Sequence, residues 1–450
     1  MEANLMMALV VFGILFLTLA AGIWVGFSLF IVGFMGMVIY SPLPAGNNMA
    51  SSVWATIEKW EYVALPLFIL MGEILYRSGI SEKLFKSLVP WLYRLPGGLL
   101  LMNIVSCTLF AAVSGSSAAT TATVGRITLA EFDKLGYDRR LAMGSLAGAG
   151  TLGFLIPPSL IMIVYAILAE VSIGKMFMAG ILPGLLLSGI YSCYIIYRGI
   201  RNPAIAPRTQ ESYSWKERLV GLKDLAPTVI LILMVLGSIY GGVATPTEAA
   251  ALGVLGATVF AFLNRQMNFK ILFECLVGAV KTNAMIMMIV VGAGFLSRVM
   301  GFLVIPAAIT REGGTHLSGF RAALTRTITE LGLSPYMLMI LLGGFYIILG
   351  CLLDGFSIVV MTLPIALPMV TAAGFDPIWF GIYLILMVEV SQITPPVGFN
   401  LFVIQGLTDE PIVKVAKYAL PFFFLMLLTT AILTVFPKIA LFLPNLMTIK

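Results

Sequence analysis

The stretch Ser114–Gly125 reads Ser-Gly-Ser-Ser-Ala-Ala-Thr-Thr-Ala-Thr-Val-Gly and directly follows the apolar run Leu99–Val113. The apolar run places the stretch at membrane depth, where no water hydrates exposed backbone N–H and C=O groups. Irregular backbone at that depth must be buried in protein or line a polar cavity. Hydroxyl side chains beside bare backbone oxygens suit a small hard cation, and a helix end there would suit an anion. The alternative is close packing between helices, where small residues and Ser or Thr are also common.

The composition of the whole chain indicates a membrane protein. Of its 450 residues, 60% are hydrophobic and only 11% are charged, and the mean hydropathy is +1.03. About a quarter of the residues of a soluble domain are charged. Because one span needs roughly 20 apolar residues, the sequence predicts an all-α polytopic membrane protein with about ten spans plus shorter hairpins.

The ionisable and thiol side chains argue against several other classes of protein. The net charge of +6 comes from Lys and Arg in short connections, a pattern that sets membrane topology and does not indicate nucleic-acid binding. His316 is the only histidine, and we expect it to be a solvated surface residue, so a catalytic histidine dyad is excluded. We therefore expect no enzyme activity, no catalytic residues and no cofactor. The four cysteines lie far apart in apolar segments and are predicted to be buried free thiols: Cys107, Cys193, Cys275 and Cys351.

The apolar segments form two halves, residues 1–200 and 225–450, joined by a basic polar linker over 201–224. In the first half we predict, in chain order, scaffold spans over 5–78 with a polar loop at Ser41–Ser52, an interfacial arm helix over 81–93, a hairpin over 97–125, a broken helix over 141–168 and a span over 173–197. In the second half we predict scaffold spans over 226–302, an arm helix over 306–331, a hairpin over 335–370, a broken helix over 378–405 and a span over 413–442.

Landmarks of the first half recur in the second at one gapless spacing of 238 residues (395 − 157). By the same spacing Ser116 falls on Asp354, to within a residue or two. The matched landmarks are Pro157-Pro158 with Pro395-Pro396, Gly136-Tyr137-Asp138 with Gly374-Phe375-Asp376, and Leu182-Pro183 with Leu420-Pro421.

The distribution of Lys and Arg predicts the orientation of the halves. If the linker over 201–224 lies in the cytoplasm, counting spans in both directions puts most basic residues on that side, as the positive-inside rule expects. Both termini then lie in the periplasm. With each hairpin counted as re-entrant, each half crosses the membrane an odd number of times, so the second half is inverted relative to the first.

Paired interruptions in inverted halves point to a transporter binding site near the middle of the membrane. Two interruptions are predicted hairpin tips, at Ser114–Thr121 and Asp354–Ser357. The other two are helix breaks, at Gly153–Ser159 and Ser391–Gly398. Each Pro-Pro pair removes two backbone donors and disfavours helix before it, which frees carbonyl oxygens that can bind a cation.

Three polar side chains lie near these interruptions, and a fourth, Glu248, lies at the start of a span. A carboxylate in an apolar run is costly unless it is paired or solvated, so Asp354 either caps a helix at the hairpin turn or contributes to a cation site. Glu389 faces the cavity on one interpretation, whereas Glu248 is expected to be a charge at a helix N-terminus. Asn400 either donates a hydrogen bond to an anionic substrate or packs between helices.

Four ordered motifs resemble those of the large membrane subunit of tripartite ATP-independent periplasmic (TRAP) transporters, the DctM-like family. The first is Phe110–Gly125, which resembles the hairpin signature of that family. The others are Gly153–Ser159, Leu353–Phe356 and Gln392–Phe402. The resemblance covers nearly the whole chain.

The resemblance implies a sodium-driven importer in which a transport domain with both hairpins moves, by an elevator-type motion, against a fixed scaffold. It implies a bacterial inner-membrane location, a small DctQ-like membrane subunit and a periplasmic DctP-like binding protein. That protein would deliver an organic acid such as a C4-dicarboxylate, sialic acid or a similar carboxylate. The alternative is a stand-alone sodium–dicarboxylate symporter or antiporter of the same broad architecture.

The resemblance also implies three sets of site residues, with sodium as the only metal. The first cation set is Ser114, Gly115, Ser116, Ser117, Gly153 and Pro157. The second cation set is Asp354, Gly355, Ser357, Ser391, Thr394 and Pro396. The substrate set is Ser116, Thr120, Pro158, Gly355, Pro395 and Asn400.

Two features differ from the family pattern. The second arm segment contains an extra polar stretch, about Arg311–Arg321, that would alter contacts with the partner proteins. The chain also begins directly with the first spans of the large subunit, so we expect the small subunit to be a separate protein.

Overall fold

The computed structural model describes residues 10, 13–40, 43–207, 213–303, 334–396 and 398–447. The described part of the chain is helical and contains no strand. The arm helix predicted for 306–331 lies outside the described residues, together with His316 and the extra polar stretch near 311–321, and so does the start of the span predicted from residue 5.

The first half contains scaffold helices, a hairpin, a broken helix and one long final helix. The scaffold helices are α2 (Val25–Tyr40), α3 (Ala45–Ile57) and α4 (Ala64–Arg77), and α5 (Ile80–Leu92) covers the segment predicted as an arm. The hairpin is α6 (Leu100–Ser114) and α7 (Ser117–Lys134), followed by α8 (Arg139–Gly150), α9 (Leu152–Leu155), α10 (Leu160–Leu168) and α11 (Ile173–Arg201).

The second half follows a similar order. Its first three long helices are α12 (Trp215–Tyr240), α13 (Pro246–Leu263) and α14 (Phe269–Leu303). The second hairpin is α16 (Pro335–Gly350) and α17 (Gly355–Ala372), followed by α18 (Pro377–Gln392), α19 (Phe399–Thr408), α20 (Ile412–Val435) and α21 (Lys438–Leu446).

Several predicted boundaries were wrong. The polar stretch Ser41–Ser52 is not all loop, because α3 begins at Ala45 directly after Pro44, whose fixed φ suits a helix start. Helix α7 continues past residue 125 to Lys134 and is followed by Gly136 at a φ of +72°, the left-handed conformation that commonly ends helices.

Two more boundaries differ towards the end of each half. The linker predicted for 201–224 is shorter, since α12 begins at Trp215 with a capping box between Ser214 and Glu217. The last segment, predicted as one span over 413–442, is two helices separated at Phe436-Pro437. Proline has no backbone N–H to continue the helical hydrogen bonds.

The structure has fewer helices long enough to span a membrane, among the described residues, than the roughly ten spans that the sequence predicts. Among the described residues, six helices are long and apolar enough to cross a membrane, or seven if the bent pair Arg139–Leu155 and Leu160–Leu168 counts as one span. Breaks divide other apolar stretches into helices of 10–17 residues, such as α16 and α18, which are too short for the roughly 20 residues of a span.

The predicted burial of the cysteines is only half right. All four are free thiols, and Cys107 and Cys275 are buried. Cys351 is partly exposed beside the second hairpin tip, and Cys193 is exposed on α11. An apolar segment can therefore present a thiol on its outer face.

Helix caps recur at the 238-residue spacing that the sequence predicts. Asp138 accepts hydrogen bonds from two backbone N–H groups at the start of α8, and Asp376 does the same at the start of α18. Gly136 and Gly374, two residues earlier in each case, both have positive φ. The spacing therefore joins positions with the same local structure.

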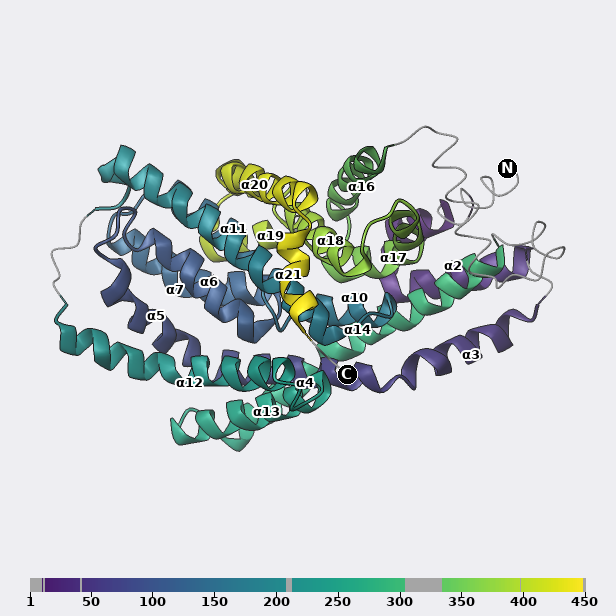
Figure 1. Cartoon of the computed structure of the whole chain (residues 1–450), viewed down its shortest axis with the longest axis horizontal. Coiled ribbons are helices and arrows are strands. Elements are labelled where there is room, and N and C mark those ends of the chain that lie inside the picture. The colour runs from purple at the N-terminus through teal and green to yellow at the C-terminus, as the bar shows by residue number, and fades with distance from the viewer. Residues whose placement is uncertain are drawn as a thin grey trace.

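Two classes of helix differ in what covers them. Helices α8, α9, α10 and α18 are buried along nearly their whole length, and a helix apolar all round is stable in that setting. Helices α12, α13 and α14 instead expose large apolar side chains such as Leu233, Leu255 and Phe273. Figure 1 shows α12 and α13 along one edge of the molecule, away from the centrally placed α18. We assign the outer apolar faces to contact with lipid.

Connections of the first half contact the linker and one connection of the second half. The sequence predicts all of them on one side of the membrane, and their contacts are consistent with that arrangement. Three hydrogen bonds join them: Lys83 Nζ to Asn264 Oδ1 (3.2 Å), Asp138 N to Ile205 O (3.0 Å) and Tyr213 N to Tyr93 OH (3.4 Å).

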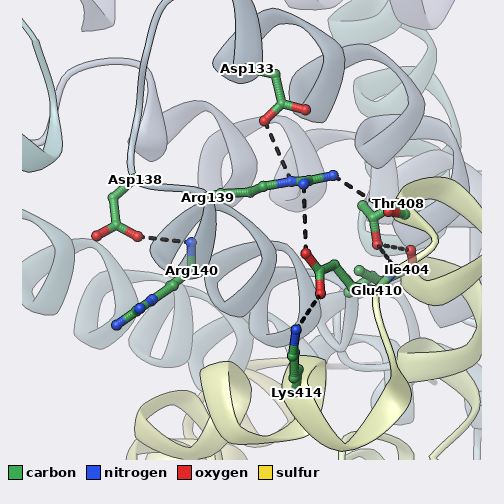
Figure 2. Close-up of polar contacts among 8 residues, drawn as sticks. All are labelled: Asp133, Asp138, Arg139, Arg140, Ile404, Thr408, Glu410 and Lys414. Atoms are coloured by element: carbon green, nitrogen blue, oxygen red, sulfur yellow. Dashed lines mark hydrogen bonds and ion pairs between the residues drawn. The ribbon is translucent and has the colours of Figure 1, made fainter.

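An ion-pair cluster adds a further link between the halves (Figure 2). The Arg139 guanidinium lies 3.6 Å from an oxygen of Asp133 and 3.6 Å from an oxygen of Glu410, and it donates to Thr408 O at 3.4 Å. Lys414 contacts the other oxygen of Glu410 at 3.5 Å. The connections before α8 and before α20 therefore lie at the same end of the molecule.

Replacing Arg139 by glutamine is expected to lower the free energy of unfolding by less than about 1 kcal/mol, because exposed ion pairs contribute little. The melting temperature of the purified protein measures the effect. Lys134→Gln is the matched control, since Lys134 is also exposed and, among the described residues, pairs only with Glu131. A loss several times larger in Arg139→Gln alone would show that the cluster holds the two halves together.

Candidate functional site

The first hairpin tip is pressed against the first helix break. Gly115 has a φ of +59°, and a Cβ added there would lie 2.8 Å from Pro158 O. The N–H of Leu160 donates to Gly115 O at 3.2 Å. A Cβ added to Gly153 would lie 2.5 Å from Ser116 O. Only glycine fits at both positions, so the glycines in the two motifs are explained by close backbone approach.

Hydroxyl groups line this tip. Ser116 is the N-cap of α7 and accepts from the N–H of Ala119 at 3.4 Å. The Thr120 hydroxyl donates to Ser116 O at 2.8 Å and lies 2.8 Å from the Ser114 hydroxyl. The predicted residues of the tip are therefore grouped around a short segment of backbone, with Ser116 itself only partly buried.

Ser117 is one of the points where the two halves meet. Its Oγ lies 3.1 Å from Gly150 O at the end of α8 and 3.0 Å from Glu389 Oε2 on α18. The Asn400 side chain, on α19, donates to the same Oγ at 2.8 Å. The other oxygen of Glu389 accepts from the backbone N–H of Phe154 at 3.2 Å. All five residues are buried.

The second hairpin tip is built around a carboxylate. Asp354 is the N-cap of α17 and accepts from the N–H groups of Phe356 (3.1 Å) and Ser357 (3.3 Å), and Ser357 Oγ also donates to it. A Cβ added to Gly350 would lie 1.8 Å from Ser391 Oγ, so this hairpin also packs closely on the broken helix. The interpretation of Asp354 as a helix cap is therefore confirmed, and it occupies the position that Ser116 has in the first hairpin.

The two breaks differ in exposure, which the sequence does not predict. Residues 151–160 at the first break are all buried. At the second break Thr394 is partly exposed, and Pro395 and Pro396 are exposed. Cys351 lies beside this break, with its Sγ 3.3 Å from Pro395 O. The two breaks, which match in sequence, therefore have different surroundings.

Most predicted site residues are brought together as two tip-and-break pairs, and Asn400 lies at the first tip. Although it follows the second break in sequence, its side chain is fully buried and bonds to the first tip. Gly355 lies between the halves, because a Cβ there would meet Val388 at 2.9 Å and Phe154 at 3.0 Å. Pro157 is buried within the first break.

Two polar residues at the site are absent from the predicted site sets. Glu389, which the sequence places near the second break, contacts Ser117 across 272 residues of sequence. Ser159 directly follows the first Pro-Pro pair, and its hydroxyl is buried with no hydrogen-bond partner in the described part of the chain. The sequence indicates Ser159 through its place in the break, where a hydroxyl oxygen can bind a cation as a carbonyl oxygen can. Within the described residues no group of three or more His, Cys, Asp or Glu side chains could hold a metal.

Replacing Ser117 by alanine is expected to destabilise the protein by about 1–3 kcal/mol, because it leaves buried polar partners unpaired. Thermal unfolding of the purified protein measures this loss. Ser106→Ala is the matched control, since the Ser106 hydroxyl is buried without a partner. Equal melting temperatures for the two variants would contradict a bridging role for Ser117.

Glu248 fulfils the expectation of a charge at a helix start. It forms a capping box with Thr245 at the N-terminus of α13, with hydrogen bonds of 2.8 Å and 2.9 Å to the Thr245 N–H and hydroxyl. It is therefore assigned to helix capping and not to the site.

The fold is similar to that of a solved membrane protein. The structure of MtrF from Neisseria gonorrhoeae matches with a TM-score of 0.60 at 14% identity, covering 88% of this chain and 83% of that one. Two hairpin tips contact two helix breaks within a bundle of apolar helices. This arrangement defines the class as a polytopic membrane transport protein.

The chain belongs to the family described as "Tripartite ATP-independent periplasmic transporter, DctM component", which matches residues 12–439. The C4-dicarboxylate TRAP transporter large permease protein DctM of Pseudomonas aeruginosa is 35% identical over 421 residues, covering 93% of this chain and 94% of that protein. The ectoine TRAP transporter large permease protein TeaC of Halomonas elongata is 30% identical, covering 92% of this chain and 93% of that protein. The resemblance drawn from the four motifs is thus confirmed, and this is a family of transporter components, not of enzymes.

Proposed function

We propose that the chain is the large subunit of a sodium-coupled secondary importer for an organic acid anion. The observation that carries the proposal is the first tip, where Ser117 Oγ and Gly150 O meet beside a buried helix break. Ser159 Oγ and Asn400 Oδ1 are also buried, and neither has a hydrogen-bond partner among the described residues. Unpaired buried oxygens are costly unless a ligand binds them, and oxygen ligands suit a hard cation such as sodium. The donors present therefore fit the cation that the family resemblance implies.

The substrate is proposed to bind between the two tips. The N-termini of α7 and α17 lie at these tips, and helix N-termini favour an anion. The exposed second break at Pro395 and Pro396 provides access. Named relatives handle a C4-dicarboxylate and ectoine, which both contain carboxylate, so a small carboxylate is the proposed class. The proposed contacts are Ser116, Thr120, Pro158, Gly355, Pro395 and Asn400.

The partners and orientation follow from the family and from the basic connections. A tripartite periplasmic system implies two further components, proposed to be a separate small membrane subunit and a periplasmic substrate-binding protein. We place the linker in the cytoplasm, both termini in the periplasm and the chain in the bacterial inner membrane, with the second half inverted relative to the first. The clustering of basic connections through Lys83, Asp138 and Arg139 supports this orientation.

An elevator motion is proposed because buried central helices adjoin outer helices with lipid-facing apolar side chains. The contact between Gly72 of α4 and the α6 chain near Val113 crosses that boundary, since a Cβ on Gly72 would lie 3.7 Å from Val113 O. A thiol cross-link between Gly72→Cys and Val113→Cys, in a background without native cysteines, should stop uptake reversibly. The control is the same double-cysteine variant before oxidation, which should take up substrate as the cysteine-free protein does. Uptake that persists across the first cross-link would contradict the elevator motion.

The experiment that tests the proposed function is uptake by proteoliposomes that contain this chain and its small subunit. Uptake is expected only when the binding protein, its ligand and an inward sodium gradient are all present. A potassium gradient in place of sodium should give none. Robust uptake without any binding protein would instead favour the alternative of a stand-alone symporter or antiporter.

A further inference from the structure

Two pairs of aromatic side chains join the end of α5 to the start of α12, which lie side by side in Figure 1. Trp91 and Trp215 pack edge to face with their ring centroids 6.4 Å apart, and Tyr93 and Tyr213 do so at 5.1 Å. Trp215 is 70% exposed. Tryptophan and tyrosine are common at membrane–water interfaces, because their rings are apolar and carry one polar group. The junction therefore has the side chains expected of two helices that meet at a membrane surface.

Two arginines lie over these rings. The Arg218 Cζ is 4.9 Å from the ring centroid of Trp215 and 5.9 Å from that of Trp91. The Arg94 Cζ is 5.4 Å from the ring centroid of Tyr93. An aromatic face attracts a guanidinium and leaves N–H donors around its edge, where their geometry fits the oxygens of a phosphate. The rings therefore hold both arginines in position for an anionic ligand.

Arg218 has a donor without an acceptor. Its Nε is buried and forms no hydrogen bond with any described residue, and none of the ion pairs in the described part of the chain includes Arg218. The neighbouring carboxylate of Glu217 accepts instead from the N–H and the hydroxyl of Ser214, at 2.6 Å and 3.0 Å. A buried N–H group without an acceptor is costly, so it indicates a ligand that supplies one.

The charge of the junction also favours an anion. Residues 82–94 and 214–224 contain six basic and three acidic side chains. The sequence predicts the arm in the membrane interface and the linker in the cytoplasm, so the junction is expected at the inner surface of the membrane. Anionic lipids give the cytoplasmic leaflet a negative surface potential that attracts basic segments. The junction therefore matches this leaflet in the sign of its charge.

An exposed apolar surface on α12 begins directly beyond Arg218. Leu219 and Leu222 are both exposed, and α12 is long and apolar enough to cross a membrane. Because residues four apart share a helix face, Leu222 lies on the face of Arg218, and Leu219 lies on the face of Trp215. Acyl chains need such a surface, whereas a free phosphate ion does not. The arrangement therefore favours a lipid over a soluble anion.

From these contacts we propose that the junction of α5 and α12 binds the phosphate headgroup of an anionic phospholipid, with Arg218 as its main contact and Arg94 beside it. The acyl chains lie along α12 over Leu219 and Leu222. Bound lipid stabilises the contact between α5 and α12, and α5 leads directly into the first hairpin at α6. The site therefore ties the start of the hairpin to the membrane surface. It lies outside the sodium and substrate sets, so it does not depend on the proposed function.

The test measures lipid binding and needs no transport. The purified chain with its small subunit is placed in mixed micelles of detergent and phosphatidylcholine, and phosphatidylglycerol replaces phosphatidylcholine at constant total lipid and ionic strength. A lipid that binds the folded state raises the melting temperature by mass action. We expect a saturable rise, and in Arg218→Gln we expect half of the rise to need about five-fold more phosphatidylglycerol, since one cation near the surface is lost. Phosphatidylglycerol retained by the wild type and by this variant is counted in parallel by mass spectrometry.

Matched variants and a soluble anion make the result specific. Lys417→Gln removes one exposed positive charge on α20 and should keep the wild-type response. Arg218→Lys keeps the charge without the planar donor edge and should also bind the lipid more weakly, which covers the case in which Arg218→Gln does not fold.

Three results would overturn the proposal. The first is a wild-type protein, or an Arg218→Gln variant, whose melting temperature shows that Arg218 does not matter: no response to phosphatidylglycerol in the former, or the wild-type response in the latter. The second is an equal loss in Arg218→Gln and Lys417→Gln, which would show attraction to surface charge in general. The third is a rise with inorganic phosphate as large as that with phosphatidylglycerol, which would show a site for the free anion.

Discussion

Replacing Gly153 by alanine is expected to reduce uptake by about ten- to hundred-fold and to lower the melting temperature. A Cβ at this position would lie 2.5 Å from Ser116 O and 2.6 Å from Ser117 Cα, both in the hairpin backbone. Backbone atoms cannot turn aside as a flexible side chain can, so the tip must move away from the break. Overpacking of this kind costs about 1–3 kcal/mol. If the tip must return to the break each time an ion binds, the same free energy lowers uptake by about ten- to hundred-fold.

The matched control for this prediction is Gly189→Ala on α11. A Cβ at Gly189 meets nothing within 4 Å, so the same chemical change there should leave uptake and melting temperature unchanged. Uptake is measured in proteoliposomes with the small subunit and the binding protein. Wild-type uptake by Gly153→Ala would show that the contact between the first tip and the first break is not needed for transport.

The sequence could predict the parts of the fold that depend on local chemistry. The Pro-Pro pairs mark both breaks, because proline removes backbone donors wherever it lies. The 238-residue spacing correctly joins Ser116 with Asp354, since both side chains cap the second helix of a hairpin. Asp138 and Asp376 correspond for the same reason. Caps, glycines and prolines act within a few residues, so a single sequence is enough to identify them.

The contacts between the halves could not be predicted in the same way. Ser117 meets Glu389 across 272 residues and Asn400 across 283 residues. No local pattern encodes how α18 is placed against α7, because that placement depends on packing over the whole buried core. For the same reason the repeat suggested two equivalent breaks, whereas the first is buried and the second, at Pro395 and Pro396, is exposed.

Replacing Asp354 by asparagine is expected to leave stability nearly unchanged and to abolish most of the sodium dependence of uptake. Asparagine is as good a helix N-cap as aspartate, so it keeps the hydrogen bonds from the N–H groups of Phe356 and Ser357 and removes only the charge. Asp354→Ala removes the capping hydrogen bonds as well as the charge, so it should also cost about 1 kcal/mol of stability. The difference between the two variants separates the cap from the proposed second cation site.

Asp376→Asn is the control for this last comparison. Asp376 caps α18 through two backbone N–H groups, at 2.7 Å and 3.1 Å, and lies outside the proposed site, so the change should affect neither stability nor sodium dependence. Initial uptake is measured over a series of sodium concentrations for all three variants. If Asp354→Asn and Asp376→Asn both behave as the wild type, Asp354 is a helix cap only, because a ligand charge cannot be removed from a sodium site without weakening it. If only Asp354→Asn loses its sodium dependence, the carboxylate acts on the cation as well as on the helix.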